Sequence, residues 1–264
     1  MSAQSAPAAR PGAVDGWTLS APQEDETGGV RSARYRFGAG YGFFYFDQDF
    51  DPWHLGEVSV ERKDNTAALI ARLNYAYRFD ESAVQVEGDA YPFLTRNVYG
   101  YLNVGYSPSS SFPKLRLGAD LWANLPGAWE ISGGVRYLRF PDEQFPMLTG
   151  SLGRYYGDYW TSLRPFLVFD DSEVSWSLGV VTRRYYVDAD NYFGLLASYG
   201  DAPDPNISDE ELDRVGNFLL EFAGKHPLSP MVSWAWVLSY QWEELSGRGN
   251  RNRVGFRVAF ERRF

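Results

Sequence analysis

The final stretch of the chain alternates apolar and polar residues with a period of two, and this feature limits the possible folds more than any other. One face of the stretch carries the apolar side chains of Val254, Phe256, Val258 and Phe260. Small or charged residues stand between them, and the chain ends on Phe264. Period-two alternation indicates a β-strand with one apolar and one polar face. Such a strand fits either the edge of a soluble sandwich or the wall of a membrane barrel.

The terminal aromatic residue resembles the closing strand of bacterial outer-membrane β-barrels, although Arg262 stands where those strands usually carry a further apolar residue. The same alternation recurs along most of residues 32–264 and predicts about fourteen strands. Single-chain bacterial barrels have an even number of strands, which agrees with this count. The segment Met147–Tyr156 is rich in glycine and its facing is ambiguous, so twelve strands remain an alternative.

The connections between the predicted strands alternate in length. The longer ones are 47–53, 107–114, 140–146, 200–213 and 243–252, and the shorter ones are 63–65, 94–97, 125–127, 157–158, 188–190 and 225–229. Transmembrane barrels have long extracellular loops and short periplasmic turns. A soluble sandwich has no reason to keep this rhythm. The sequence therefore predicts an all-β fold, a transmembrane antiparallel up-and-down β-barrel in the bacterial outer membrane with both termini periplasmic.

Composition agrees with this prediction and excludes one class of partner. The mean hydropathy of −0.37 is low for a membrane protein, but only alternate residues of a barrel strand face lipid. A net charge of −9 without a basic stripe argues against nucleic acid as a partner. The absence of cysteine fits export through an oxidising compartment. Residues 1–31, rich in Ala, Pro, Ser and Gly, are expected to form a disordered leader ahead of a barrel domain over 32–264.

Two short stretches carry a family resemblance. The sequence LGRYYGDYWTSLRP at Leu152–Pro165 and the sequence RRYY at Arg183–Tyr186 resemble the YaiO family of outer-membrane β-barrel proteins. The resemblance implies a role in the cell envelope, with exopolysaccharide export as one such role. Some members carry an amino-terminal helical-repeat domain, which here would be a separate periplasmic scaffold protein. The family supplies no catalytic residues to transfer to this chain.

The predicted inward faces of the strands combine charged and aromatic side chains. The candidates for lining the lumen and contacting a solute are Arg72, Glu87, Asp89, Tyr99, Tyr101, Arg116, Asp120, Trp122, Glu130, Arg136, Arg164, Arg183 and Tyr185. One interpretation is structural, with opposite charges joined in salt bridges that make the barrel rigid. The other is a polar path, in which the aromatic rings suit the apolar faces of sugars.

Signals for enzymatic chemistry are weak. The two histidines, His54 and His226, lie near strand ends outside any pattern of a catalytic triad or metal site. Glu87 and Asp89 have a spacing compatible with acid–base chemistry, but arginines on the neighbouring strands explain them as ion pairs. The acidic residues of the 200–213 loop lack the spacing of a calcium site. We therefore expect no enzyme, no metal site and no cofactor.

The leading hypothesis is an outer-membrane barrel that assists the passage or assembly of a polar envelope polymer, a porin-like role that includes polysaccharide export. The first alternative is a structural or partner-docking barrel with a filled lumen, and the second is an envelope-modifying enzyme. Expected partners are outer-membrane lipid and lipopolysaccharide, the barrel assembly machinery, a periplasmic helical-repeat scaffold and a glycan.

Overall fold

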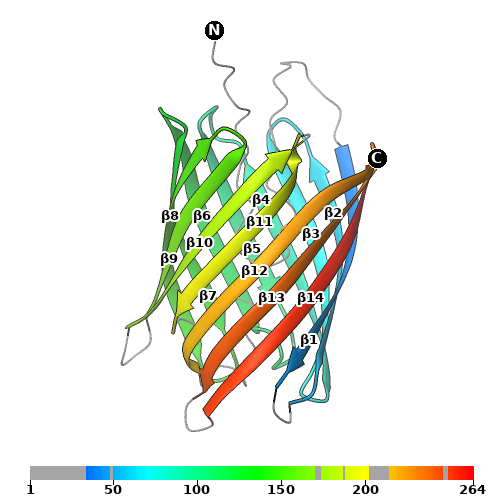
Figure 1. Ribbon diagram of the computed structural model, residues 1–264, viewed down its shortest axis with the longest axis vertical. Helices are drawn as coiled ribbons and strands as arrows, with labels where there is room; N and C mark the ends of the chain where they lie inside the picture. The colour runs from blue at the N-terminus through cyan, green and yellow to red at the C-terminus, as the bar shows by residue number, and fades with distance from the viewer. Residues whose placement is uncertain (1–33, 48–49, 170–173, 187, 202–213, 246–248) are drawn as a thin grey trace.

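The computed structural model describes residues 34–47, 50–169, 174–186, 188–201, 214–245 and 249–264, and the expected leader over 1–31 lies outside them. These residues form a closed antiparallel barrel of fourteen strands, tilted against the barrel axis (Figure 1). The strands are β1 (Arg34–Phe46), β2 (Trp53–Lys63), β3 (Ala67–Arg78), β4 (Glu81–Pro92), β5 (Val98–Tyr106), β6 (Leu115–Leu125), β7 (Trp129–Arg139), β8 (Gln144–Tyr156), β9 (Tyr159–Phe169), β10 (Val174–Tyr186), β11 (Asp188–Gly200), β12 (Arg214–Ser229), β13 (Val232–Leu245) and β14 (Gly249–Arg263).

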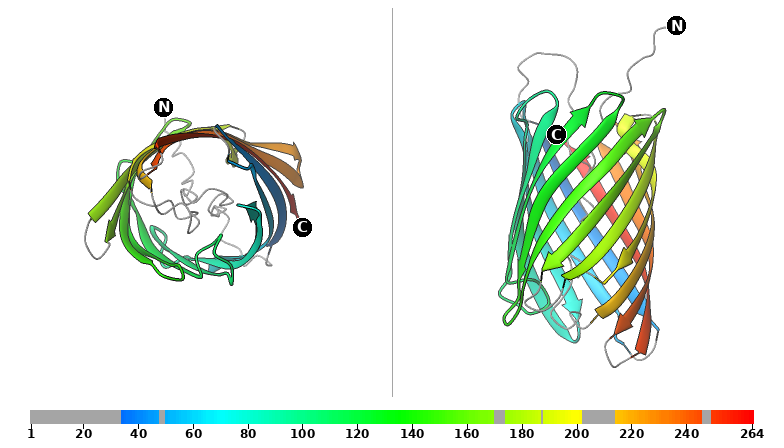
Figure 2. Two further views of the ribbon diagram at one scale, coloured as in Figure 1. Left: turned by 90° about the horizontal axis from the view of Figure 1, so that it is seen from below. Right: turned by 90° about the vertical axis from the view of Figure 1, so that its left-hand side faces the viewer.

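Each strand pairs with its neighbours in sequence, and β1 pairs with β14 to close the wall (Figure 2). The seam between them runs from the pair Arg36 and Arg263 to the pair Phe46 and Arg253. Beyond the pairing, the backbone N–H of Phe264 donates to the carbonyl oxygen of Tyr35 over 2.9 Å. The predicted pairing of the last strand with the first is therefore confirmed.

The ambiguous segment Met147–Tyr156 is part of a regular strand. It belongs to β8, which pairs with β7 along its whole length and with β9 on the other side. Leu148 and Leu152 point outward, while Met147, Thr149 and Ser151 point into the barrel. The alternative of twelve strands is wrong, because β8 is paired on both sides in a barrel of fourteen strands, although its pairing with β9 is interrupted at Gly150 and Ser151.

The two faces of the wall differ as the alternation predicts. On the outside, large apolar side chains are exposed on every side of the barrel, for example Phe43, Leu121, Trp176 and Phe256. The inward side chains of the same strands are mainly polar, charged or aromatic, and many are buried. An apolar outer band with a polar interior is the arrangement of a barrel surrounded by lipid.

The two ends of the barrel carry different connections. We call the end at which β1 begins and β14 finishes the terminal end, and the other the loop end. The connections at the terminal end include 64–66, 126–128 and 157–158, whereas those at the loop end include the long 107–114 as well as the two-residue turn 79–80. At the 64–66 turn, hydrogen bonds from the Thr66 hydroxyl and from the backbone N–H groups of Thr66 and Ala67 lower the pKa of Asp64 to about 2. The charged Asp64 carboxylate thus accepts the hydrogen bonds that hold the β2–β3 turn.

No helix in the described part of the chain is long and apolar enough to cross a membrane.

The facing of β14 can be tested by introducing arginine once at an outward position and once at an inward position of this strand. Phe256 is 43% exposed on the outer surface, paired with Phe43 and Leu238. We expect Phe256→Arg to destabilise the folded barrel by about 2–4 kcal/mol, because it places a charge against hydrocarbon. The matched variant is Ala259→Arg, whose side chain points inward between the small residues Gly40 and Ala235. This variant should unfold at nearly the wild-type urea concentration.

Heat-modifiable gel migration and urea unfolding in detergent or vesicles would measure both variants. Equal losses of stability in the two variants would contradict the facing of β14.

Candidate functional site

The interior of the barrel contains all of the residues proposed from the sequence as lining the lumen. Most of them are buried: Arg72, Glu87, Asp89, Tyr99, Tyr101, Arg116, Asp120, Trp122, Glu130, Arg136 and Arg164. Arg183 and Tyr185 are half-buried. The structure joins most of the charged ones in local networks on the wall and does not gather them at one reactive centre. Whether any of them contacts a solute stays a prediction.

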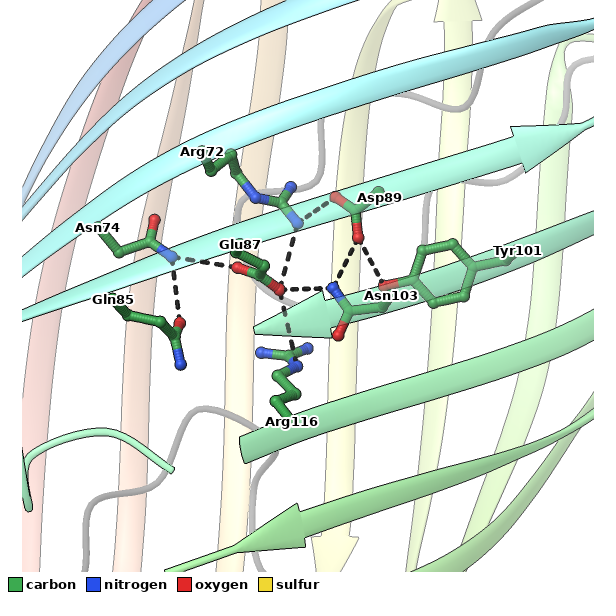
Figure 3. Close-up of polar contacts among 8 residues, drawn as sticks. All are labelled: Arg72, Asn74, Gln85, Glu87, Asp89, Tyr101, Asn103 and Arg116. Carbon is green, nitrogen blue, oxygen red and sulfur yellow. Dashed lines mark hydrogen bonds and ion pairs between the residues drawn. The ribbon is translucent and has the colours of Figure 1, made fainter. Parts of the chain in front are cut away.

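One network spans strands β3 to β6 (Figure 3). At its centre, Arg72 pairs with Asp89 and lies 3.4 Å from a carboxylate oxygen of Glu87. The same oxygen of Glu87 lies 3.7 Å from Nε of Arg116. Each of these side chains is at most 6% exposed. Two carboxylates and two guanidinium groups thus balance one another, as the structural interpretation of Glu87 and Asp89 predicts.

Neutral side chains occupy the remaining acceptor positions of the two carboxylates. The amide of Asn103 donates to both Glu87 and Asp89 over 2.7 Å, and the Tyr101 hydroxyl donates to Asp89 over 3.1 Å. Asn74 donates to Glu87 over 3.1 Å. A carboxylate with this many donors is held in one orientation. The network therefore stiffens this sector of the wall.

A second ion pair requires a glycine on the neighbouring strand, because a larger residue there would collide with it. Asp120 on β6 pairs with Arg136 on β7 over 2.5 Å, and the Arg136 guanidinium lies 5.0 Å from the ring centroid of Tyr101. The Asp120 carboxylate lies directly over Gly134, where a Cβ atom would be 1.7 Å from Oδ1. Only glycine fits there, so the backbone of β7 makes the space in which this pair forms.

Further charged residues of the lumen lie near the closing seam; sequence reasoning placed Arg257 and Glu221 in the lumen but missed Arg251, Glu243, Lys225 and Glu261. Arg251 pairs with Glu243 over 2.6 Å, Lys225 pairs with Glu261 over 2.8 Å, and Arg257 pairs with Glu221 over 2.5 Å. Extending the period-two facing of β12, β13 and β14 to every residue would have found the missed residues. The pairs show that ion pairing continues around the barrel.

The two histidines lie outside the lumen. The His54 ring accepts or donates a hydrogen bond with the Tyr41 hydroxyl over 2.7 Å, on the outward face of β2. His226 lies on the outer face of β12 among the rings of Phe193 and Trp236. Both are packed with aromatic residues of the outer surface. No group of side chains suited to holding a metal ion occurs among the residues that the structure describes.

The lumen lining is asymmetric, which the sequence did not predict. The inward residues of β3 to β9 are mostly buried; they include Gln85, Glu87, Asn103, Arg116, Trp122, Arg136 and Ser162. The inward residues of β10 to β13 are mostly only half-buried; they include Ser175, Ser177, Leu196, Ser198, Glu221, Val237 and Ser239. We call the first sector the packed half and the second the accessible half. Serine, glycine and alanine occupy many of the inward positions of the accessible half.

The glycine under Asp120 gives a sharp test of the second ion pair. In Gly134→Ala the new methyl group collides with Asp120, so we expect a loss of about 1–3 kcal/mol in stability. Gly133→Ala is the matched control, because this neighbour points outward and a Cβ there has no atom within 4 Å. Denaturant unfolding of the two variants would check the difference. Equal stabilities would show that the Asp120–Arg136 pair does not need the space at Gly134.

Comparison with known structures confirms the type of barrel. The outer membrane protein Omp33 of Acinetobacter baumannii aligns with a TM-score of 0.55 at 13% identity, covering 88% of this chain and 99% of that one. A protein described as the CymD monoaromatic hydrocarbon channel aligns with a TM-score of 0.56 at 7% identity, covering 87% of this chain and 88% of that one. At these identities the similarity shows the fold alone. No curated protein is significantly similar to this chain in sequence.

The sequence itself assigns the family. Residues 34–205, more than half of the 264-residue chain, match the model described as the YaiO membrane beta barrel domain. This match and the porin-like structural neighbours show that the protein is a β-barrel of the bacterial outer membrane. The resemblance of Leu152–Pro165 and Arg183–Tyr186 is therefore confirmed, and the chain belongs to the YaiO family of membrane β-barrel domains.

Proposed function

We propose that this barrel assists the passage of a polar envelope polymer, a glycan, across the outer membrane. The observation that carries the proposal is the accessible half of the lumen. Its inward side chains remain half-buried in a closed wall, whereas those of the packed half are covered. A path for a solute would follow β10 to β13 along the barrel axis.

The chemistry of the accessible half suits a hydroxylated solute. Ser175, Ser177, Ser198 and Ser239 present hydroxyl groups, each able to donate and accept a hydrogen bond. Val237 and Leu196 lie between them and provide apolar contact. A sugar ring has hydroxyl groups at its edge and C–H groups on its faces, so a mixed lining of this kind complements it.

The ion pairs of the lumen weaken the long-range electrostatic field that a solute meets. Arg72, Arg116 and Arg136 are each placed beside a carboxylate, so their fields largely cancel at a distance. A lining of this kind does not hold a hydrated chain by strong long-range attraction. Weak, repeated contacts allow a polymer to enter and also to leave.

The packed half supports the second candidate, a structural or partner-docking barrel. Fourteen strands lie between the eight strands whose interior side chains can fill and the sixteen or more that leave a wide channel. Networks such as the one around Arg72 would fill such an interior if they continued into the accessible half. Conductance separates the two candidates.

Planar-bilayer recordings of the purified barrel test the proposal. We expect a small, discrete conductance that maltoheptaose, used as a neutral glycan probe, interrupts reversibly. Ser198→Trp places a large ring in the accessible half between Gly179 and Leu219 and should reduce the conductance severalfold. Ala197→Trp, one residue earlier, points outward and should leave it unchanged.

A wild-type barrel that is sealed, or equal conductance in the two tryptophan variants, would contradict passage through the accessible half. A sealed barrel would favour the structural candidate.

The direction of passage depends on the orientation of the barrel. We propose that the terminal end, with both chain termini, faces the periplasm and that the loop end faces outward. A peptide tag inserted after Ser109, in the 107–114 connection at the loop end, should be labelled by antibody on intact cells. A tag inserted after Gly157, in the 157–158 turn, should be labelled only after the outer membrane is permeabilised. The reverse pattern would place the termini outside.

A further inference from the structure

One lumen cation differs from the others in its surroundings. The side chain of Arg183 points into the barrel from β10, near the terminal end of the accessible half. Its guanidinium carbon lies 4.6 Å from the ring centroid of Tyr192 and 5.6 Å from that of Trp160. Tyr185, on the same face of β10, pairs with Tyr192 across the strands. Arg183 is therefore enclosed by aromatic rings.

Several other lumen cations have acidic partners. Arg72, Arg136 and Arg257 each pair with a carboxylate within the wall. Among the residues that the structure describes, no carboxylate pairs with Arg183, and the side chain is only half-buried. Its guanidinium group thus lies beside ring faces and donates a hydrogen bond to the Tyr185 hydroxyl. A guanidinium group has five N–H donors, so others can serve an added anion.

The residues opposite Arg183 on the two neighbouring strands are a glycine and a tryptophan. The residue opposite on β11 is Gly194, where a Cβ atom would lie 3.4 Å from the Arg183 side chain. Trp160, opposite on β9, is 1% exposed, and its indole N–H is buried without a hydrogen-bond acceptor among the described residues. A ligand hydroxyl or a bridging water would satisfy this donor.

Aromatic rings continue along the same end of the lumen. Tyr155 on β8 packs beside Trp160 with ring centroids 6.2 Å apart. Further round, Tyr99 and Trp122 stack with centroids 5.7 Å apart and planes 8° from parallel. Trp160, Tyr99 and Trp122 are buried in the wall, whereas Tyr155, Tyr185 and Tyr192 are half-buried and have ring surface that a solute in the lumen can reach. Stacked against sugar C–H groups, such faces give attraction without strict orientation.

We infer that Arg183, with Trp160, Tyr185 and Tyr192, forms a binding site for an acidic sugar unit. The guanidinium donates charge-assisted hydrogen bonds to the sugar carboxylate, the half-buried rings of Tyr185 and Tyr192 contact the apolar faces of the pyranose, and the buried Trp160 positions Arg183. The inference deepens the proposed function and rests on it, because it assigns a glycan with carboxylate groups to the same path. In the proposed orientation, the site is the first that a polymer meets on entering from the periplasm.

Equilibrium titration of the purified full-length barrel in detergent micelles tests the site without requiring an open channel. The probes are trigalacturonate, maltotriose and inorganic phosphate. Wild-type protein should bind trigalacturonate more tightly than either of the other two, and the affinity should fall as salt is raised. Arg183→Gln should weaken trigalacturonate binding by about 10- to 100-fold, the effect of losing hydrogen bonds from a charged group.

Arg184→Gln is the matched control. Arg184 is the next residue and lies on the outer face, where its guanidinium carbon is 5.8 Å from the ring centroid of Tyr159. Arg184 is therefore an arginine of the same strand that also lies beside an aromatic ring, but outside the lumen. This variant should bind trigalacturonate with unchanged affinity.

Equal binding of trigalacturonate and maltotriose by the wild-type protein overturns the inference even if a variant fails to fold. Equal binding of trigalacturonate and phosphate removes the contribution of the rings and also overturns it. Equal affinity of the Arg183 and Arg184 variants overturns the location of the site. A sealed barrel with Arg183-dependent binding supports the acidic-sugar site but contradicts transport, so the two failures are distinguishable.

Discussion

The structure depends on one requirement, that every backbone N–H and C=O group inside the hydrocarbon region finds a partner within the wall. In a sheet this is possible only if the first strand pairs with the last, as β1 and β14 do from Arg36 to Phe46. Backbone hydrogen bonds fix both ends of this seam. The N–H of Phe264 donates to the carbonyl oxygen of Tyr35 at the terminal end, and the N–H of Asp47 donates to the carbonyl oxygen of Asn252 at the loop end. Once the sheet is closed, side chains alternate between lipid and an enclosed interior.

Enclosure creates the second constraint, since charges that leave bulk water must be compensated. In the packed half, Arg72 and Arg116 are compensated by Glu87 and Asp89, and the amide of Asn103 completes their hydrogen bonding. Such a network is rigid because moving one member leaves another uncompensated. The cost of burying charge thus produces a stiff wall on one side of the lumen. In the accessible half, serine and other small residues accompany a few charged side chains, of which Glu221 and Lys225 are compensated by Arg257 and Glu261.

The sequence predicted the closed barrel and the facing of its strands because period-two alternation is a local property of each strand. It predicted that Arg183 and Glu87 share the lumen, for the same reason. It could not predict that Glu87 is enclosed by partners while Arg183 is not, since this depends on which residues stand opposite after the register is fixed. The role of Gly134 was equally hidden, because it appears only when Asp120 lies over it.

A rigid packed half and an accessible half of small residues have different consequences for a solute. The first sets the shape of the interior, since its side chains are held by several partners each. The second sets the chemistry, because its hydroxyl groups and apolar residues are reached by solvent. Arg183 stands where these two properties meet: its position is held by Trp160 and Tyr192 in the wall, yet its charge is offered to the lumen. Under the proposed function, Arg183 therefore contributes to selectivity as a half-buried lumen cation with no carboxylate partner among the described residues.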